Sequence, residues 1–360
     1  MWAKPSGAFA PEWLYYEGGL WRQPGLYLQE GRVVGITPEP DPWAVPVEGL
    51  LSPAWVNAHT HLEFSAWRGQ VPRGRGMMDF LQRMTAPRPP ASPEAIHRAL
   101  TEAMAEGTWA FVSHQNQPLP PEAIPPEVTV VALAEFYGLR LRGALRRYSR
   151  LRHWGYPLTP HSFYALNPLY RRLGRRPTPF PRSVHFFESL EERLWLEGGK
   201  GPFGHFFRRF IRQPRLPRRW LYWLIQWYRR APALWLVHAT EAPPKLLEYL
   251  LDRLPRLYIV LCPEANYYLF RRFPDLAFWR KYPHRFLLGT DSLANAETLS
   301  VWPVVRRLLW AGYKWTEVLP ALVDTPRRWM TLVPHWVQVA PLAEDGTILP
   351  STQARTFTGC

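Results

Sequence analysis

Residues 50–63 read Leu50-Leu51-Ser52-Pro53-Ala54-Trp55-Val56-Asn57-Ala58-His59-Thr60-His61-Leu62-Glu63, an apolar run that ends in two histidines one residue apart. On a β-strand, side chains at positions i and i+2 point to the same face. His59 and His61 therefore project together from the end of a strand. Two neutral imidazoles held in this way supply half of a divalent-metal site. Two surface histidines on an edge strand would look the same, so a metal site also requires suitable ligands farther along the chain.

Further polar residues occur downstream, each directly after a short apolar run that is typical of a buried strand. They are His185, Glu188, His238 and Asp291. The pattern predicts eight strands, at about 53–58, 108–114, 128–135, 153–160, 182–187, 234–238, 257–262 and 285–290. Helices are expected between them, for example at 93–106, 190–197, 221–228, 242–253 and 297–310. Eight strand–helix units indicate a (β/α)8 barrel.

The two ends of the chain have a different pattern, with short strand-like runs separated by Gly-rich turns at the N-terminus. Apolar segments near the C-terminus could form strands that pair with these N-terminal strands. We therefore predict an α/β protein in which residues 51–334 form a TIM barrel. Residues 1–50 and 335–360 would together form a small β-sandwich-like element. A chain of 360 residues has the length of one large barrel with such an addition.

The composition predicts a cytoplasmic protein with a sizeable core. Hydrophobic residues make up 47% of the chain, and its two cysteines, Cys262 and Cys360, argue against a disulfide framework. The N-terminus lacks the apolar segment of a signal peptide. No apolar run approaches the roughly 20 residues that span a bilayer, so we expect no membrane association. The aromatic stretch 220–228 reads as a packed helix that could support a homodimer.

The formal net charge of +15 comes mostly from arginines, many of them in 140–152, 171–182 and 208–230. Nucleic acid is one partner that such a charge would suit. No RNA-recognition motif, zinc-finger spacing or helix-turn-helix pattern accompanies the charge, so we expect no nucleic-acid binding, and solvated helix faces are the plainer explanation. A positive field would also attract an anionic small substrate.

Histidines and carboxylates converge if the barrel forms, because the carboxyl ends of its strands meet at one mouth. The residues expected there are His59, His61, His161, His185, Glu188, His238 and Asp291. Four of them could hold a metal ion with one position left for water. A divalent metal lowers the pKa of bound water from about 15.7 toward about 7. A carboxylate beside it can take and relay the proton.

Six motifs together resemble the amidohydrolase superfamily, in its deaminase and chlorohydrolase branch, over roughly residues 20–310. They are VNAHTHLE at 56–63, TPHS at 159–162, HFFES at 185–189, LVHA at 236–239, CPEAN at 262–266 and GTDSLA at 289–294. Two segments depart from the family pattern. Ser52-Pro53-Ala54 stands where Pro-Gly is usual, and the pocket-shaping segment at 264–266 lacks the usual Ser before Asn.

The resemblance implies a role for each matching residue. His59, His61, His185 and Asp291 would bind one metal ion, Zn²⁺ or alternatively Fe²⁺. Glu188 would carry a proton to a ring nitrogen of the substrate, His238 would orient the hydrolytic water, and Asp291 would also act as its base. His161 would contact the substrate, with a purely structural role as the alternative. The reaction would be attack of hydroxide on an amino-bearing heteroaromatic carbon, followed by loss of ammonia.

Some expectations rest on weaker signals. Glu63 and Trp67 are candidate substrate-pocket residues, and His114 could point into the mouth. No lysine occurs between Lys4 and Lys200, so the carboxylated lysine that bridges two metals in other amidohydrolases has no counterpart. We therefore expect a mononuclear centre.

The stretch from Asn57 to Ser65, followed by Arg68-Gly69 and Val71-Pro72, looks most like the aminodeoxyfutalosine deaminases of menaquinone biosynthesis. Their substrate carries a benzoate, which suits a basic chain. Deamination of S-adenosylhomocysteine, methylthioadenosine or guanine, and dechlorination, are the enzymatic alternatives. A barrel that keeps its metal for structure, or that binds nucleic acid, is the alternative of another class.

Overall fold

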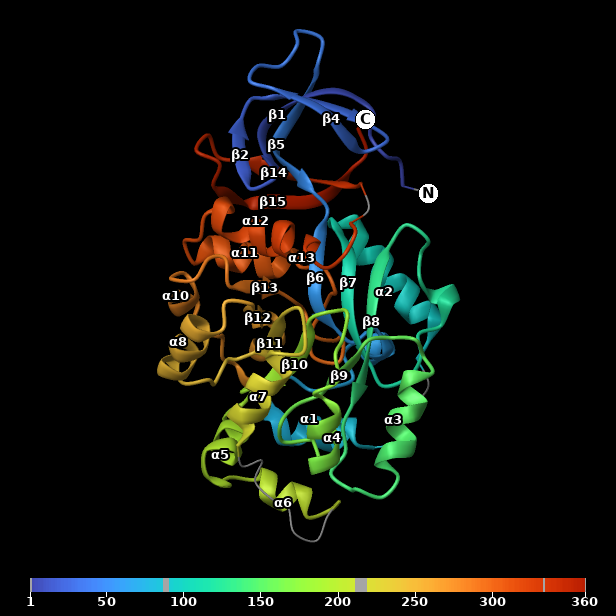
Figure 1. The fold of residues 1–360 in the computed structure, drawn as a ribbon. Coiled ribbons are helices and arrows are strands. Elements are labelled where there is room, and N and C mark those ends of the chain that lie inside the picture. Colours follow the sequence, from blue (N-terminus) through green and yellow to red (C-terminus); the bar gives the residue numbers. More distant parts are fainter. Residues whose placement is uncertain (1, 87–90, 211–218, 333, 360) are drawn as a thin grey trace.

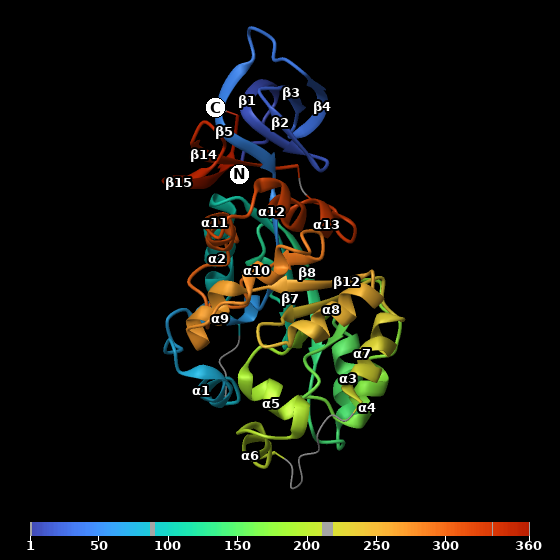
Figure 2. The ribbon, with the colours of Figure 1, turned by 90° about the vertical axis from the view of Figure 1, so that its left-hand side faces the viewer.

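The computed structural model describes residues 2–86, 91–210, 219–332 and 334–359. Three sheets make up its β structure, one of seven strands and two of four. In both views the seven-stranded sheet lies at one end of the molecule and the two parallel sheets lie in the middle, while helices α3 to α6 lie at the opposite end (Figures 1 and 2). The predicted mixed α/β class with parallel strands is confirmed.

The N- and C-terminal segments form the seven-stranded sheet, in the order β15-β14-β5-β1-β3-β4 with β2 paired to β1. Its strands are β1 (Gly7–Tyr16), β2 (Gly19–Arg22), β3 (Gly25–Gln29), β4 (Arg32–Thr37), β5 (Val45–Pro53), β14 (Trp336–Leu342) and β15 (Ile348–Phe357). Strand β14 pairs antiparallel with β5, so the C-terminus returns to the N-terminal strands as expected. The β-sandwich-like form and the boundaries at 50/51 and 334/335 remain predictions.

Eight parallel strands carry the rest of the β structure, in the orders β6-β7-β8-β9 and β10-β11-β12-β13. Their bounds are β6 (Trp55–Thr60), β7 (Thr108–Gln115), β8 (Thr129–Phe136), β9 (Leu158–Pro160), β10 (Arg182–Phe186), β11 (Leu234–His238), β12 (Leu257–Leu261) and β13 (Phe286–Leu288). The His185 amide donates to the His161 carbonyl at 2.8 Å, and the Thr290 amide donates to the His59 carbonyl at 3.1 Å. The two sheets therefore meet at both outer edges, which supports their interpretation as one barrel.

The predicted fourth strand differs most from the structure. The sequence predicts it at 153–160, but β9 begins only at Leu158. His153 instead ends helix α3 (Ala144–Arg152), and Gly155 adopts a φ of 75° in the turn after this helix. Glycine adopts that conformation without the steric cost that other residues meet. The aromatic residues that suggest an extended strand, Trp154 and Tyr156, pack against the core from this turn.

The remaining helical elements surround these strands. They are η1 (Leu62–Trp67), α1 (Gly76–Met84), α2 (Pro93–Ala105), η2 (Pro121–Ala123), α4 (Pro168–Leu173), α5 (Leu190–Gly198), α6 (Phe203–Phe207), α7 (Trp220–Tyr228), α8 (Pro244–Arg253), α9 (Pro263–Phe270), α10 (Leu276–Trp279), α11 (Trp302–Trp310), α12 (Trp315–Leu322) and α13 (Asp324–Arg327). The five expected helices overlap α2, α5, α7, α8 and α11. Helices α8 and α11 start later than predicted, at a proline-containing first turn, where proline is favoured. None of the described helices is long and apolar enough to cross a membrane.

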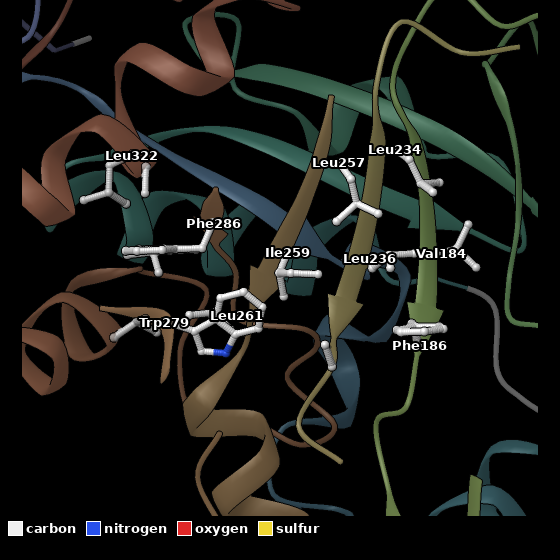
Figure 3. Close-up of a cluster of buried hydrophobic side chains, with 14 of the residues drawn as sticks. Val184, Phe186, Leu234, Leu236, Leu257, Ile259, Leu261, Trp279, Phe286 and Leu322 are labelled. Atoms are coloured by element: carbon white, nitrogen blue, oxygen red, sulfur yellow. The ribbon is translucent and has the colours of Figure 1, made fainter. Parts of the chain in front are cut away.

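Alternating side chains on β10 to β13 separate the packed core from the face that carries the site. Val184 and Phe186 join Leu236 and Ile259 in a buried cluster that also contains residues of the covering helices (Figure 3). His185 lies between Val184 and Phe186 in sequence and so points to the opposite face of the sheet. Complete burial of the apolar face fixes this register, since a shift by one residue would turn His185 into the core.

Candidate active site

The four predicted metal ligands come together at the carboxyl ends of the parallel strands. His59 and His61 belong to the end of β6, His185 to β10, and Asp291 follows β13. The Nε2 atoms of His59 and His61 each lie 3.6 Å from Asp291 Oδ1. The Nε2 atoms of His61 and His185 lie 3.3 Å apart. All four residues are buried, and His61, His185 and Asp291 keep only a small exposed surface.

His238 and Glu188 lie beside this cluster. His238 Nε2 is 3.9 Å from Asp291 Oδ2 and 3.7 Å from Glu188 Oε1. On the other side of the ring, Nδ1 lies 3.4 Å from the side-chain nitrogen Nδ2 of Asn266. His238 can therefore contact both carboxylates with one nitrogen while Asn266 orients the ring through the other.

The donor set fits a divalent cation. Burial lowers the pKa of His61 to about 4, and burial also holds the pKa of His59 and His185 well below its usual range, so these imidazoles are neutral and offer lone pairs. Both ring nitrogens of His59 and Nε2 of His238 are buried without a hydrogen-bond partner in the described part of the chain. Burial alone would raise the pKa of Asp291, but the surrounding imidazoles hold it well below its usual range.

The turn after β10 holds Glu188. Phe187 adopts a φ of 47°, and Ser189 caps helix α5 by accepting a hydrogen bond from the Glu192 amide at 3.3 Å. The Glu188 amide in turn donates to Glu192 Oε2 at 2.8 Å. Burial raises the pKa of Glu188 well above its usual range, and the nearby charges of Asp291 and Glu192 add to this effect. Glu188 is thus suited to carry a proton at neutral pH.

Two buried carboxylates near the site were missed from the sequence. Burial raises the pKa of Glu192 to about 7, and its position three residues after Ser189 is that of a capping box, a signal that was present in the sequence. Glu135 is the last residue but one of β8, and its Oε1 lies 2.9 Å from Nδ1 of both His114 and His161. Its position at the end of a strand, like that of the predicted histidines, was the available signal.

Glu63 and Trp67 lie behind the pocket surface. The Glu63 carboxylate accepts hydrogen bonds from the Asn116 amide at 3.0 Å, the Asn116 side chain at 2.7 Å and the Gln117 amide at 3.1 Å. Asn116 itself lines the pocket. Trp67 packs edge-on against Phe64, with ring centroids 6.2 Å apart. Glu63 therefore positions Asn116 at the pocket surface. Direct contact of Glu63 and Trp67 with a substrate remains a prediction.

A cavity of about 390 Å³ opens over the cluster. Its polar floor includes His61, His161, His185, Glu188 and Asp291. Its walls are apolar, and most of them come from α1, the segment after β9 and α6. They include Met77, Phe80, Leu81, Met84, Tyr164, Phe206, Phe207 and Phe210. Arg140 and Arg147 add exposed cations at its rim. The cavity thus combines apolar walls, a buried carboxyl group whose pKa is raised, and two exposed arginines.

Comparison with known sequences finds two deaminases that resemble the chain. No family model matches the chain. It is 25% identical to an aminodeoxyfutalosine deaminase of Nitratiruptor sp. over 72% of this chain and 67% of the relative. It is 23% identical to an adenosine deaminase of Helicobacter pylori over 72% of this chain and 68% of that relative.

Solved structures share the fold. The Helicobacter pylori aminofutalosine deaminase in complex with methylthio-coformycin aligns with a TM-score of 0.71 at 18% identity, over 90% of this chain and 87% of the other. An adenosine deaminase from Xanthomonas campestris with bound zinc aligns with a TM-score of 0.60 at 19% identity, over 94% and 85%. The two relatives support the deaminase branch of the amidohydrolase superfamily, and the solved structures share the fold of the chain.

Proposed function

We propose, from the premise that the chain is an enzyme of the deaminase branch of the amidohydrolases, that it is a metal-dependent deaminase of an amino-substituted purine nucleoside. Aminodeoxyfutalosine is the substrate that we favour, which would place the enzyme in menaquinone biosynthesis in the cytoplasm. The observation that carries the proposal is the convergence of His59, His61, His185 and Asp291 with Glu188 beside them. A site that held a metal only for structure would not need a protonated carboxyl group next to it.

The position of each residue in the site supports a particular role in the proposed reaction. A divalent metal, with zinc preferred, would be held by His59, His61, His185 and Asp291 and would make water acidic enough to ionise near neutral pH. Asp291 would accept the proton of the attacking water, and His238, 3.9 Å from Asp291, would hold that water in place. Glu188 would deliver its proton to the ring nitrogen next to the carbon under attack. Asp291 would then pass the proton that it took from water to the amino group, so that ammonia could leave, and the proton of the new hydroxyl group would return to Glu188.

The cavity supports a substrate that is larger than a free base and negatively charged. A volume of about 390 Å³ falls within the range of small-molecule sites. Its aromatic and methionine side chains suit the faces of a purine and a second aromatic ring. Arg140 and Arg147 at the rim could pair with a carboxylate at the far end. S-adenosylhomocysteine also carries a carboxylate, whereas methylthioadenosine, guanine and chlorinated rings do not.

The test is release of ammonia from a panel of compounds by the metal-loaded full chain. We expect turnover of aminodeoxyfutalosine, with lower kcat/KM for S-adenosylhomocysteine, methylthioadenosine, adenosine and guanine. Asp291→Asn should be inactive toward every compound, which ties the activity to this site. Absence of turnover across the panel, in protein with one equivalent of metal, would refute the nucleoside deaminase. Preference for methylthioadenosine would refute the proposal of a carboxylated substrate but not that of a nucleoside deaminase.

Replacement of both rim arginines should weaken binding of carboxylated substrates specifically. Hydrogen bonds to charged groups contribute about 1.5–3 kcal/mol, so we expect Arg140→Met with Arg147→Met to raise KM for aminodeoxyfutalosine by roughly 10- to 100-fold. The kinetics of methylthioadenosine should not change. Arg146→Met is the matched control, because Arg146 is an exposed arginine of α3 outside the cavity lining. Equal effects on both substrates would contradict the assignment.

A further inference from the structure

Glu192 is a buried residue close to Glu188, and the proposed reaction gives it no role. It lies in the first turn of α5 and is 0% exposed. Its Oε2 atom accepts a hydrogen bond from the Glu188 amide at 2.8 Å. Its own amide donates to the Ser189 hydroxyl at 3.3 Å. Glu192 thus contacts the backbone of the residue whose side chain would supply the proton.

The turn between β10 and α5 needs support, because Phe187 adopts a φ of 47° there. This conformation is costly for a bulky side chain and persists only where the surrounding structure enforces it. The Glu241 amide donates to the Phe187 carbonyl at 2.9 Å, and the Glu188 amide donates to Glu192. The peptide unit that joins Phe187 to Glu188 is therefore held at its oxygen by Glu241 and at its nitrogen by Glu192.

Capping of α5 does not by itself account for a buried glutamate at this position. In the usual capping box, the third helical residue accepts a hydrogen bond from the amide of the cap residue. Glu192 accepts one from Glu188, which precedes the Ser189 cap. A cap stabilises a helix modestly, whereas the removal of a carboxylate from water is costly. Burial raises the pKa of Glu192 to about 7, and the amides of Glu188 and Phe187 oppose this rise. The contact with the turn is thus a second role for this side chain.

We infer that Glu192 is a positioning residue, which fixes the backbone of Glu188 so that the Glu188 side chain stays beside His238 in the floor of the cavity. The inference rests on the proposed function, because it takes Glu188 as the proton carrier. Glu192 does not line the cavity with the other described residues, so it acts through Glu188. A displacement of about 1 Å in a reacting group can cost about 100-fold in rate.

Two conservative variants separate the reach of Glu192 from its charge. Glu192→Asp keeps the carboxylate but is one methylene shorter. It should lose the bond to the Glu188 amide and lower kcat by roughly 10- to 100-fold, with little change in KM. Glu192→Gln keeps the length and an acceptor oxygen, so most of the wild-type kcat should remain. Burial and Asp291 are the larger causes of the raised pKa of Glu188, and both persist in Glu192→Gln.

Two further variants control for damage to α5. Glu191→Asp changes a partly exposed side chain of the same turn, outside the cavity lining, and should keep wild-type kcat. Ser189→Ala removes the cap and should lower Tm, but it leaves the bond between Glu192 and Glu188, so kcat should fall less than in Glu192→Asp. Wild-type kcat in Glu192→Asp, or an equal loss in Ser189→Ala, would overturn the inference.

Hydrogen exchange of the Glu188 amide tests the contact in the unchanged protein, so it holds if a variant fails to fold. We expect this amide to exchange at least about 100-fold more slowly than in an unstructured peptide of the same sequence. Exchange at the peptide rate would overturn the inference while leaving the proposed deaminase intact. A protected amide in a chain that releases no ammonia from any compound of the panel would overturn the proposed function, and with it the role of Glu192.

Discussion

Replacement of Glu188 by glutamine should lower kcat by about 10²- to 10⁴-fold, which is the usual contribution of a positioned proton-transfer group. Burial and the neighbouring carboxylates keep a proton on Glu188, and its Oε1 lies 3.7 Å from His238 Nε2. Glutamine keeps the size and the hydrogen-bonding ability of the side chain but cannot pass on a proton. The loss should therefore appear in kcat for every substrate that is turned over, with little change in KM.

Two controls separate this loss from damage to the site. Metal content should be unchanged in Glu188→Gln, because Glu188 is not among the proposed ligands. Glu191→Gln, three residues along the chain in the first turn of α5, should keep wild-type kcat, because Glu191 affects the site only through its distant charge. An enzyme that retains more than about a tenth of its activity as Glu188→Gln would need another proton carrier, and Glu192 would be the first candidate.

The sequence predicted the parts of this site that depend directly on strand periodicity. His59 and His61 are two residues apart on one strand, and His185, His238 and Asp291 each end an apolar run, so a parallel arrangement brings them to one edge. Strand positions were predicted well for the same reason. The exception was the strand at 153–160, where aromatic residues suggested an extended segment but pack from a turn instead.

The residues that the sequence did not reveal depend on contacts between distant segments. Glu135 becomes part of the site only because β8 places it beside His114 and His161, which lie 21 and 26 residues away along the chain. Glu63 resembled a pocket residue by its position after His61, but its carboxylate turns to the amides of Asn116 and Gln117. No local pattern reports which way a loop side chain points, so such residues need the folded structure.

Removal of the metal should abolish deamination and also destabilise the protein without unfolding it. Several buried imidazole nitrogens of the cluster have no hydrogen-bond partner in the described chain, so the cluster is a costly arrangement when it is empty. A metal present at 1,000 times its Kd would add about 4.1 kcal/mol to the free energy of unfolding. We therefore expect the metal-free protein to have a lower Tm, and zinc to restore both Tm and activity.

The metal-free chain should nevertheless keep its fold, because the strands that carry the ligands are fixed by the packing of their other face. Val184 and Phe186 are buried in the cluster drawn in Figure 3, and they hold His185 in place whether or not the site is filled. Circular dichroism of the chelator-treated protein should thus match the loaded form at 25 °C. His59→Gln should resemble the metal-free protein and fail to gain Tm when zinc is added. An equal rise in Tm with zinc for His59→Gln and the wild type would place the metal elsewhere.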